Sequence, residues 1–253
     1  MNRKQFFLQC ITGIMSNHLF AFNQFTSQLP ILSYTMPVLF IGHGSPMNGI
    51  EHNSFSIQWA NMATTIPQPT AVLVVSAHWL TKGTHITAMQ EPRTIHDFGG
   101  FPPQLYQVQY PAPGSPTVAA ETANLVRSTS VQLNHDWGLD HGTWTVVRHM
   151  YPKANIPVLQ LSIDASKSPQ YHYQLATELA LLRKKGVLII GSGNMVHNLG
   201  MVAWHKLQEP EFGYDWALEI NQVFKQLIIN KQHNTLINYH QLGKLADMAI
   251  PTN

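Results

Sequence analysis

The sequence predicts an α/β fold, a three-layer sandwich whose central, mostly parallel or mixed sheet is covered by helices on both faces. Short apolar runs bounded by Gly, Pro or polar residues are typical of strands in such a sheet. Segments with helical features lie between these runs, and such alternation is typical of α/β proteins. The chain has 253 residues, 44% of them apolar, which is enough for one sizeable domain with a packed core.

Four apolar runs are predicted to be buried strands. They occupy residues 37–41, 71–75, 156–163 and 187–190. The first run is closed by Gly42 and the last by Gly191. Because these runs are continuously apolar and do not alternate with polar residues, both faces of the sheet should be covered.

Five segments are predicted to be helices. They occupy residues 54–62, 115–127, 142–150, 169–185 and 212–229. The second begins with a Ser-Pro pair, which suits a helix cap and first turn. The fourth repeats leucine at helical spacing. Residues 91–114 are rich in Gly and Pro and predict a long loop, a feature that is usually functional in compact domains.

Residues 1–35 differ from the rest and predict an N-terminal extension ahead of a main domain at 36–253. Arg3 and Lys4 precede Phe6 and Phe7, as in a degenerate twin-arginine signal, but polar residues interrupt the apolar stretch that follows. A disordered extension is the alternative. We expect a cytoplasmic protein, or a periplasmic one if residues 1–35 act as a signal. No stretch is long and apolar enough to predict a membrane span.

Composition excludes several classes of protein. Charged residues are only 11% of the chain and the formal net charge is +2, so nucleic acid is not an expected partner. The single cysteine excludes an internal disulfide framework. The 14 histidines outnumber the 13 acidic residues, which directs attention to imidazole chemistry.

Three histidines lie at or just beyond the ends of predicted strands. His43 follows the first strand, His78 the second and His197 the last. Ligands of open α/β sheets bind outside the carboxyl ends of the strands, so these side chains should converge. Imidazole suits zinc and iron, and a catalytic metal commonly takes three protein ligands. The residues therefore predict one mononuclear metal site, although a structural role for each histidine stays open without a short metal motif.

Two further histidines are candidates for the same site. His141 is predicted to open a helix, where it could transfer protons beside a metal, although helix capping or packing is an equal alternative. His96, followed by Asp97, lies in the long loop and could be a solvated loop residue. The other nine histidines have no comparable setting, and we expect structural or surface roles for them.

Seven segments resemble, in order, the DOPA-type (4,5-DOPA) extradiol ring-opening dioxygenases, a branch of the class III extradiol dioxygenase family. They are MPVLFIGHGSPMN at 36–48, VSAHW at 75–79, TIHDFGGFP at 94–102, YPAPG at 110–114, WGLDHGTW at 137–144, VLQLSI at 158–163 and GNMVHN at 193–198. Together they extend over residues 36–204 and are highly specific.

The resemblance implies an activity and a set of site residues. It implies extradiol cleavage at the 4,5-position of a catechol such as L-DOPA, with both atoms of O2 inserted. It implies one divalent metal per chain, Fe(II) for catalysis or Zn(II) as bound, with His43, His78 and His197 as ligands. His141 is then the acid/base residue, and His96 lines the substrate pocket.

One departure from the family keeps two alternatives open. Family members continue, after the region matching residues 238–253, into a Pro-x-His-Tyr-x-Pro-Leu segment whose histidine is implied at the metal site. We expect the catalytic domain at 36–253 to lack this segment. The alternatives are a zinc-dependent hydrolase that uses the same three histidines, and a catalytically impaired protein that binds metal or catechol.

Overall fold

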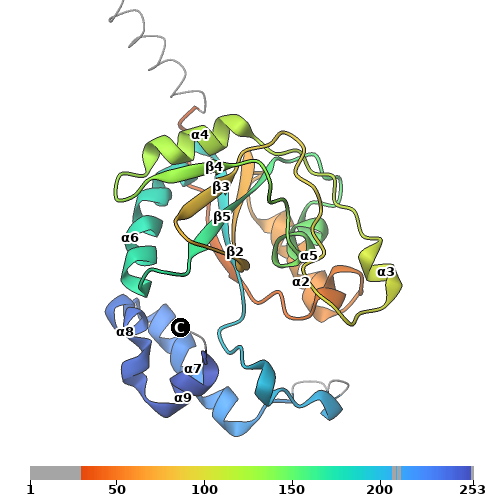
Figure 1. Ribbon diagram of the computed structural model, residues 1–253, viewed down its shortest axis with the longest axis vertical. Coiled ribbons are helices and arrows are strands. Elements are labelled where there is room, and N and C mark those ends of the chain that lie inside the picture. Colours follow the sequence, from red (N-terminus) through yellow and green to blue (C-terminus); the bar gives the residue numbers. More distant parts are fainter. Residues whose placement is uncertain (1–29, 207–208, 210–211, 252–253) are drawn as a thin grey trace, which may run out of the picture.

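The computed structural model describes residues 30–206, 209 and 212–251 (Figure 1). The predicted N-terminal extension therefore lies mostly outside the described residues. Within them, the sheet has the strand order β1-β6-β2-β5-β3-β4. The strands are β1 (Val38–Ile41), β2 (Ala71–Thr81), β3 (Thr84–Thr87), β4 (Val131–Asn134), β5 (Val158–Asp164) and β6 (Val187–Ser192). All neighbours are parallel except β3 and β5, which are antiparallel, so the sheet is mixed as predicted.

Helices cover both faces of this sheet. Figure 1 shows α4 (Pro116–Leu125) and α6 (Pro169–Leu179) on one side, and α2 (Ser54–Thr65) and α5 (His141–Met150) on the other. Val72 and Val74 of β2 belong to the core on the α2 and α5 side, whereas Leu73 between them belongs to the opposite core. The three-layer α/β prediction is therefore confirmed.

The first and last predicted helices are confirmed with small shifts. Helix α2 continues to Thr65, and the last predicted helix is α7 (Asp215–Ile229). Two short helices follow it, α8 (His233–Ile237) and α9 (Lys244–Ala249). Together these three helices enclose a separate small core, and they lie below the sheet in Figure 1. None of the helices in the described part of the chain has the length and apolar composition needed to cross a membrane.

Two strand predictions need correction. Strand β1 was predicted to be buried, but it has only β6 as a neighbour within the described residues, and Val38 and Phe40 are 53% and 59% exposed. Strand β2 was predicted to end at Val75, but it continues to Thr81 after an irregularity in its pairing with β5. His78 therefore lies inside a strand and not beyond its end.

The predicted long loop is largely confirmed. Residues 91–114 contain one short helix, α3 (Pro103–Tyr106), and Thr94 forms an isolated parallel bridge with Leu139. Reciprocal backbone bonds surround this bridge, from Ile95 N–H to the Leu139 carbonyl and from Leu139 N–H to the Arg93 carbonyl, at 2.7 and 2.8 Å. The loop is therefore fixed to the segment that leads into α5.

Candidate metal centre

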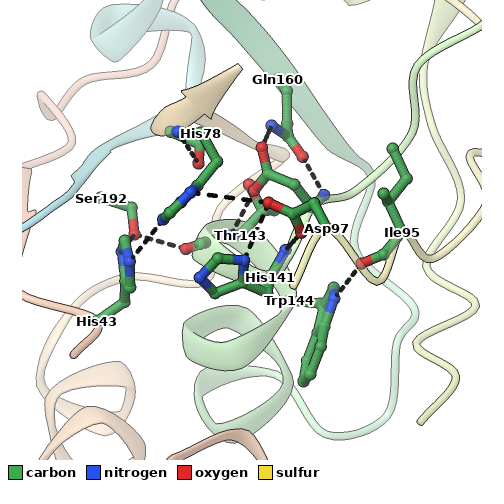
Figure 2. Close-up of polar contacts among 12 residues, drawn as sticks. His43, His78, Ile95, Asp97, His141, Thr143, Trp144, Gln160 and Ser192 are labelled. Atoms are coloured by element: carbon green, nitrogen blue, oxygen red, sulfur yellow. Dashed lines mark hydrogen bonds and ion pairs between the residues drawn. The ribbon is translucent and has the colours of Figure 1, made fainter. Parts of the chain in front are cut away.

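The candidate site lies at the carboxyl ends of three adjacent parallel strands. Strand β6 pairs with β1 on one side and β2 on the other, so the three strands end at the same edge of the sheet. His43 follows β1 by two residues, His78 lies near the end of β2, and Ser192 is the last residue of β6. Figure 2 shows these three side chains converging above the first turn of α5.

Hydrogen bonds determine which nitrogen of His43 is available. Its Nδ1 lies 2.9 Å from the Ser192 hydroxyl oxygen. That hydroxyl donates its hydrogen to the backbone carbonyl of Gly142. Because a serine hydroxyl has only one hydrogen, His43 Nδ1 must be the donor to Ser192. Its Nε2 therefore carries a lone pair, which is the form that binds a metal.

The lone pair of His43 faces a second imidazole. The Nε2 atoms of His43 and His78 lie 3.0 Å apart, and His78 Nδ1 lies 3.7 Å from Oδ2 of Asp97. A carboxylate only accepts hydrogen bonds, so the proton of His78 is favoured on Nδ1. Two nitrogens bound to one tetrahedral zinc ion at about 2.0–2.1 Å are about 3.4 Å apart. The pair therefore fits a shared metal ion with little movement.

The environment keeps both histidines neutral. Burial, followed by the charges of His141, His78 and His197, lowers the pKa of His43 to about 3. Burial and the charge of His141 likewise lower the pKa of His78 to about 4, although Asp97 opposes the shift. Neutral imidazole is the form that binds a metal, so at neutral pH neither ring has to lose a proton first.

His141 joins this pair from the start of α5. Its ring centroid lies 3.9 Å from that of His78, and its side chain is buried. Donor atoms of His43, His78 and His141 all lie within 4.8 Å of one another. Such a cluster is compatible with a single metal site.

Asp97 binds the backbone of His141 and contacts its ring. Its Oδ1 accepts the backbone N–H of His141 at 2.9 Å, and its Oδ2 lies 3.0 Å from His141 Nδ1. Burial alone would raise the pKa of Asp97, but the hydrogen bonds and charge of His141 hold it below its usual value. The ionised carboxylate thus faces the Nδ1 side of His141.

A buried pair fixes the first turn of α5. Asp140 caps the helix by accepting the N–H of Thr143 at 3.0 Å. Gln160 of β5 accepts the Asp140 N–H and donates to its Oδ2, both at 2.7 Å. Both side chains are fully buried, and burial raises the pKa of Asp140. These bonds connect the helix start to the middle of the sheet.

Gly142 permits the close approach of α5 to the histidines. A Cβ atom at this position would lie 2.5 Å from Ser76 Oγ, 3.0 Å from His78 Cδ2 and 3.3 Å from His43 Cε1. The first of these distances is too short for any side chain. The absence of a side chain therefore lets the helix start pack directly against both imidazoles.

The structure places the two other predicted site residues at the margin of this cluster. His197 is exposed, and its backbone N–H donates to the Ala249 carbonyl at 2.8 Å. It lies outside the group of three, although it is close enough to lower the pKa of His43 and of His78. His96 is half-buried, and its Nε2 lies 3.0 Å from the Val108 carbonyl oxygen within the long loop.

Comparison with known proteins decides the family. The family model described as the catalytic LigB subunit of aromatic ring-opening dioxygenase matches residues 32–249. The chain belongs to this family. The family predicted from sequence segments is therefore confirmed, and the histidine cluster is compatible with a single metal site in a LigB dioxygenase.

Two relatives of this LigB-family chain carry the same name. The 4,5-DOPA dioxygenase extradiol of Escherichia coli (strain K12) is 46% identical, over 86% of this chain and 82% of its own. The protein of the same name from Mirabilis jalapa is 32% identical, over 84% and 80%. A crystal structure of an uncharacterized Escherichia coli K12 protein has a TM-score of 0.72 at 40% identity, covering 86% of this chain and 83% of that one.

Sequence reasoning missed the residues that orient the LigB-family histidines. Ser192 lies two residues beyond the predicted strand at 187–190, and Gln160 lies inside another as a polar member of an apolar run. A buried polar residue in such a run is a signal that could have been used, because it must find a partner. Asp97 was noted only as the neighbour of His96, and its contacts depend on how the long loop folds.

Proposed function

We propose that this protein is an extradiol dioxygenase that opens the ring of a catechol such as L-DOPA at the 4,5-position, consuming O2. The observation that carries the proposal is the pair of facing Nε2 atoms of His43 and His78, 3.0 Å apart, in a LigB-family chain. The names of the relatives support DOPA as the substrate. The proposal assigns this activity to residues 36–253.

We assign the metal ligands to His43, His78 and His197. His43 and His78 have their Nδ1 atoms directed to Ser192 and Asp97, so each offers Nε2. His197 completes the set from the turn after β6 and is close enough to both rings to affect their pKa. A bound Fe(II) supplies the electron transfer between catechol and O2, whereas Zn(II) has no redox chemistry.

His141 is the proposed acid/base residue. Its Nδ1 faces Asp97 at 3.0 Å, which leaves Nε2 to exchange a proton with a substrate oxygen. Its side chain is only 6% exposed, so bulk water has little access to that proton. A carboxylate behind the ring holds it in one orientation while the proton moves.

His96 is proposed to form one wall of the substrate pocket together with aromatic neighbours. Its ring centroid lies 5.8 Å from that of Phe98 and 6.0 Å from that of Trp144. Phe98 in turn contacts His141 edge-on, with the centroids 5.6 Å apart. These rings extend from the long loop to the acid/base residue and would suit the flat face of a catechol.

A zinc-dependent hydrolase is the second candidate, and the comparisons do not favour it. Such an enzyme needs a base for the attacking water, and Asp97 is a carboxylate in contact with the cluster. Its oxygens already face the Nδ1 atoms of His78 and His141 and the backbone N–H of His141. Asp97 is thus engaged with protein groups, which argues against that role.

Anaerobic reconstitution tests the proposed function. The purified chain is loaded with Fe(II), mixed with L-DOPA without oxygen, and then exposed to air. We expect oxygen uptake and a yellow muconic-semialdehyde product, and neither from the Zn(II)-loaded protein. If iron and L-DOPA both bind but oxygen is not consumed, the proposal is wrong and the chain is a catalytically impaired binding protein. Hydrolysis with zinc but not iron would support the hydrolase.

A further inference from the structure

One carboxylate faces two histidines that have different proposed roles. Oδ2 of Asp97 lies 3.0 Å from Nδ1 of His141 and 3.7 Å from Nδ1 of His78 (Figure 2). The other oxygen, Oδ1, accepts the backbone N–H of His141 at 2.9 Å. The two imidazole rings contact each other directly, with centroids 3.9 Å apart. Asp97 therefore touches a proposed metal ligand and the proposed acid/base residue at once.

The backbone holds Asp97 in this position. The bond from the Ile95 N–H to the Leu139 carbonyl ties the loop to the segment before α5. Its two residues lie two positions before Asp97 and His141, respectively. The indole N–H of Trp144 in α5 also donates to the Ile95 carbonyl at 2.9 Å. Both bonds fix Ile95, two residues before Asp97, to the part of the chain that carries His141, so the contact of the carboxylate with His141 does not depend on the side chain alone.

The other nearby carboxylate cannot take this place. Asp140 is fully buried, and its oxygens accept the N–H of Thr143 and the amide of Gln160. These bonds direct it into the helix start and the sheet. Asp97 remains as the carboxylate that faces both Nδ1 atoms.

We propose that Asp97 is a positioning residue that holds both His78 and His141 in the Nδ1–H tautomer, which turns both Nε2 atoms toward the metal and substrate. A carboxylate has no hydrogen to donate, so its negative charge favours the hydrogen on the Nδ1 atom of each ring that faces it, although the 3.7 Å contact with His78 is longer than a hydrogen bond and His141 Nδ1 is not aligned for one. For His78 this leaves the metal-binding lone pair on Nε2. For His141 it leaves Nε2 for proton transfer, a role that rests on the proposed function.

The Asp97→Asn variant tests this directly. An amide has nearly the same shape as a carboxylate but only one accepting oxygen. It therefore cannot accept the backbone N–H of His141 and also present an acceptor to the Nδ1 atoms of both rings. Its NH2 group would then face at least one Nδ1 atom and favour the Nε2–H tautomer there. The Asp97→Glu variant keeps the carboxylate and should restore the Nδ1–H tautomers. Asp136→Asn, an exposed position, is the matched control.

Nitrogen NMR of histidine-labelled protein reads the tautomers, and Zn(II) titration reads the affinity. In the Zn(II)-loaded wild type, where the metal ion lies between the facing Nε2 atoms, we expect hydrogens on Nδ1 of both His78 and His141. In Asp97→Asn we expect at least one to move to Nε2 and the Zn(II) affinity to fall about 10- to 100-fold. Asp136→Asn should match the wild type. Nε2–H tautomers in the wild type, or an unchanged pattern in Asp97→Asn, would overturn the proposal.

These measurements separate this proposal from the enzymatic one. Neither the tautomer measurement nor the Zn(II) titration requires turnover. Both therefore test the positioning role of Asp97 even if the Fe(II)-loaded protein fails to consume oxygen. The wild-type spectrum also needs no variant to fold. If Asp97→Asn does not fold, the wild-type tautomers and the Asp97→Glu variant still decide the matter.

Discussion

His43 and His78 approach each other through their Nε2 atoms, which lie 3.0 Å apart at the end of the sheet. Each ring has its Nδ1 directed to another group, Ser192 for His43 and Asp97 for His78. Two lone pairs at this distance repel each other unless a proton or a cation lies between them. The protein therefore maintains an arrangement that a metal ion would stabilise.

Replacing His78 should abolish metal binding. A ligand that binds only the folded state raises its stability, so Zn(II) should increase the melting temperature of the wild type. In His78→Ala we expect little or no increase, because one of the two facing nitrogens is gone. Thermal melts with and without Zn(II) provide the measurement. His135→Ala, at an exposed position, should behave as the wild type does. An undiminished Zn(II) effect in His78→Ala would contradict the assignment.

His197 and His141 should respond differently to substitution. If His197 is the third ligand, His197→Ala should lose metal on desalting, whereas His141→Gln should retain it and lose oxygen uptake. Metal content and oxygen consumption of the two variants provide the measurement. The donor atoms of His141, and not those of His197, lie within 4.8 Å of the His43 and His78 donors. If His141→Gln loses metal and His197→Ala does not, then His141 is the third ligand and His197 is not.

Adding one methyl group at Gly142 should destabilise the protein. Helix propensity alone would favour alanine by up to about 1 kcal/mol. Instead the new Cβ would lie 2.5 Å from Ser76 Oγ and 3.0 Å from His78, and such overpacking costs about 1–3 kcal/mol. Urea unfolding of Gly142→Ala measures the sign. Gly99→Ala is the control, since a Cβ there meets nothing within 4 Å.

Removing the amide of Gln160 should also destabilise the fold. Gln160→Leu leaves the Asp140 N–H and one carboxylate oxygen buried without their partner, at a cost of about 1–3 kcal/mol for each unsatisfied group. We expect a lower urea midpoint and weaker Zn(II) binding, because the helix start that carries His141 loses its anchor. Gln132→Leu on β4 is exposed and should have little effect. Equal midpoints for the two variants would show that the network is unimportant.

The sequence predicted the parts of the fold that depend on apolar runs. The runs at 71–75 and 187–190 became the central strands β2 and β6, because their residues pack on both faces of the sheet. Strands β3 and β4 were missed, since THIT and VQLN are four residues long and mostly polar or mixed. Strand β1 is apolar enough to predict a strand, but the run alone does not reveal that it lies at an edge.

The candidate site was predictable to the extent that it depends on strand ends. His43 and His78 could be brought together in advance because the parallel strands of one sheet end at the same edge. The neighbourhood of His141 depends instead on the packing of α5 across β2 and on the fold of a long Gly- and Pro-rich loop. Periodicity carries no information about such contacts, and so Asp97 could not be assigned a role beforehand.

The Ser192 hydroxyl has a consequence for the order of assembly. It accepts from His43 and donates to the carbonyl of Gly142, so a single side chain joins β6, the turn after β1 and the start of α5. Until α5 has docked, that hydroxyl hydrogen is free to turn toward His43, and the imidazole has no fixed tautomer. High-affinity metal capture should therefore coincide with the docking of α5. A coloured metal probe such as Co(II) would then report the arrival of this helix during refolding.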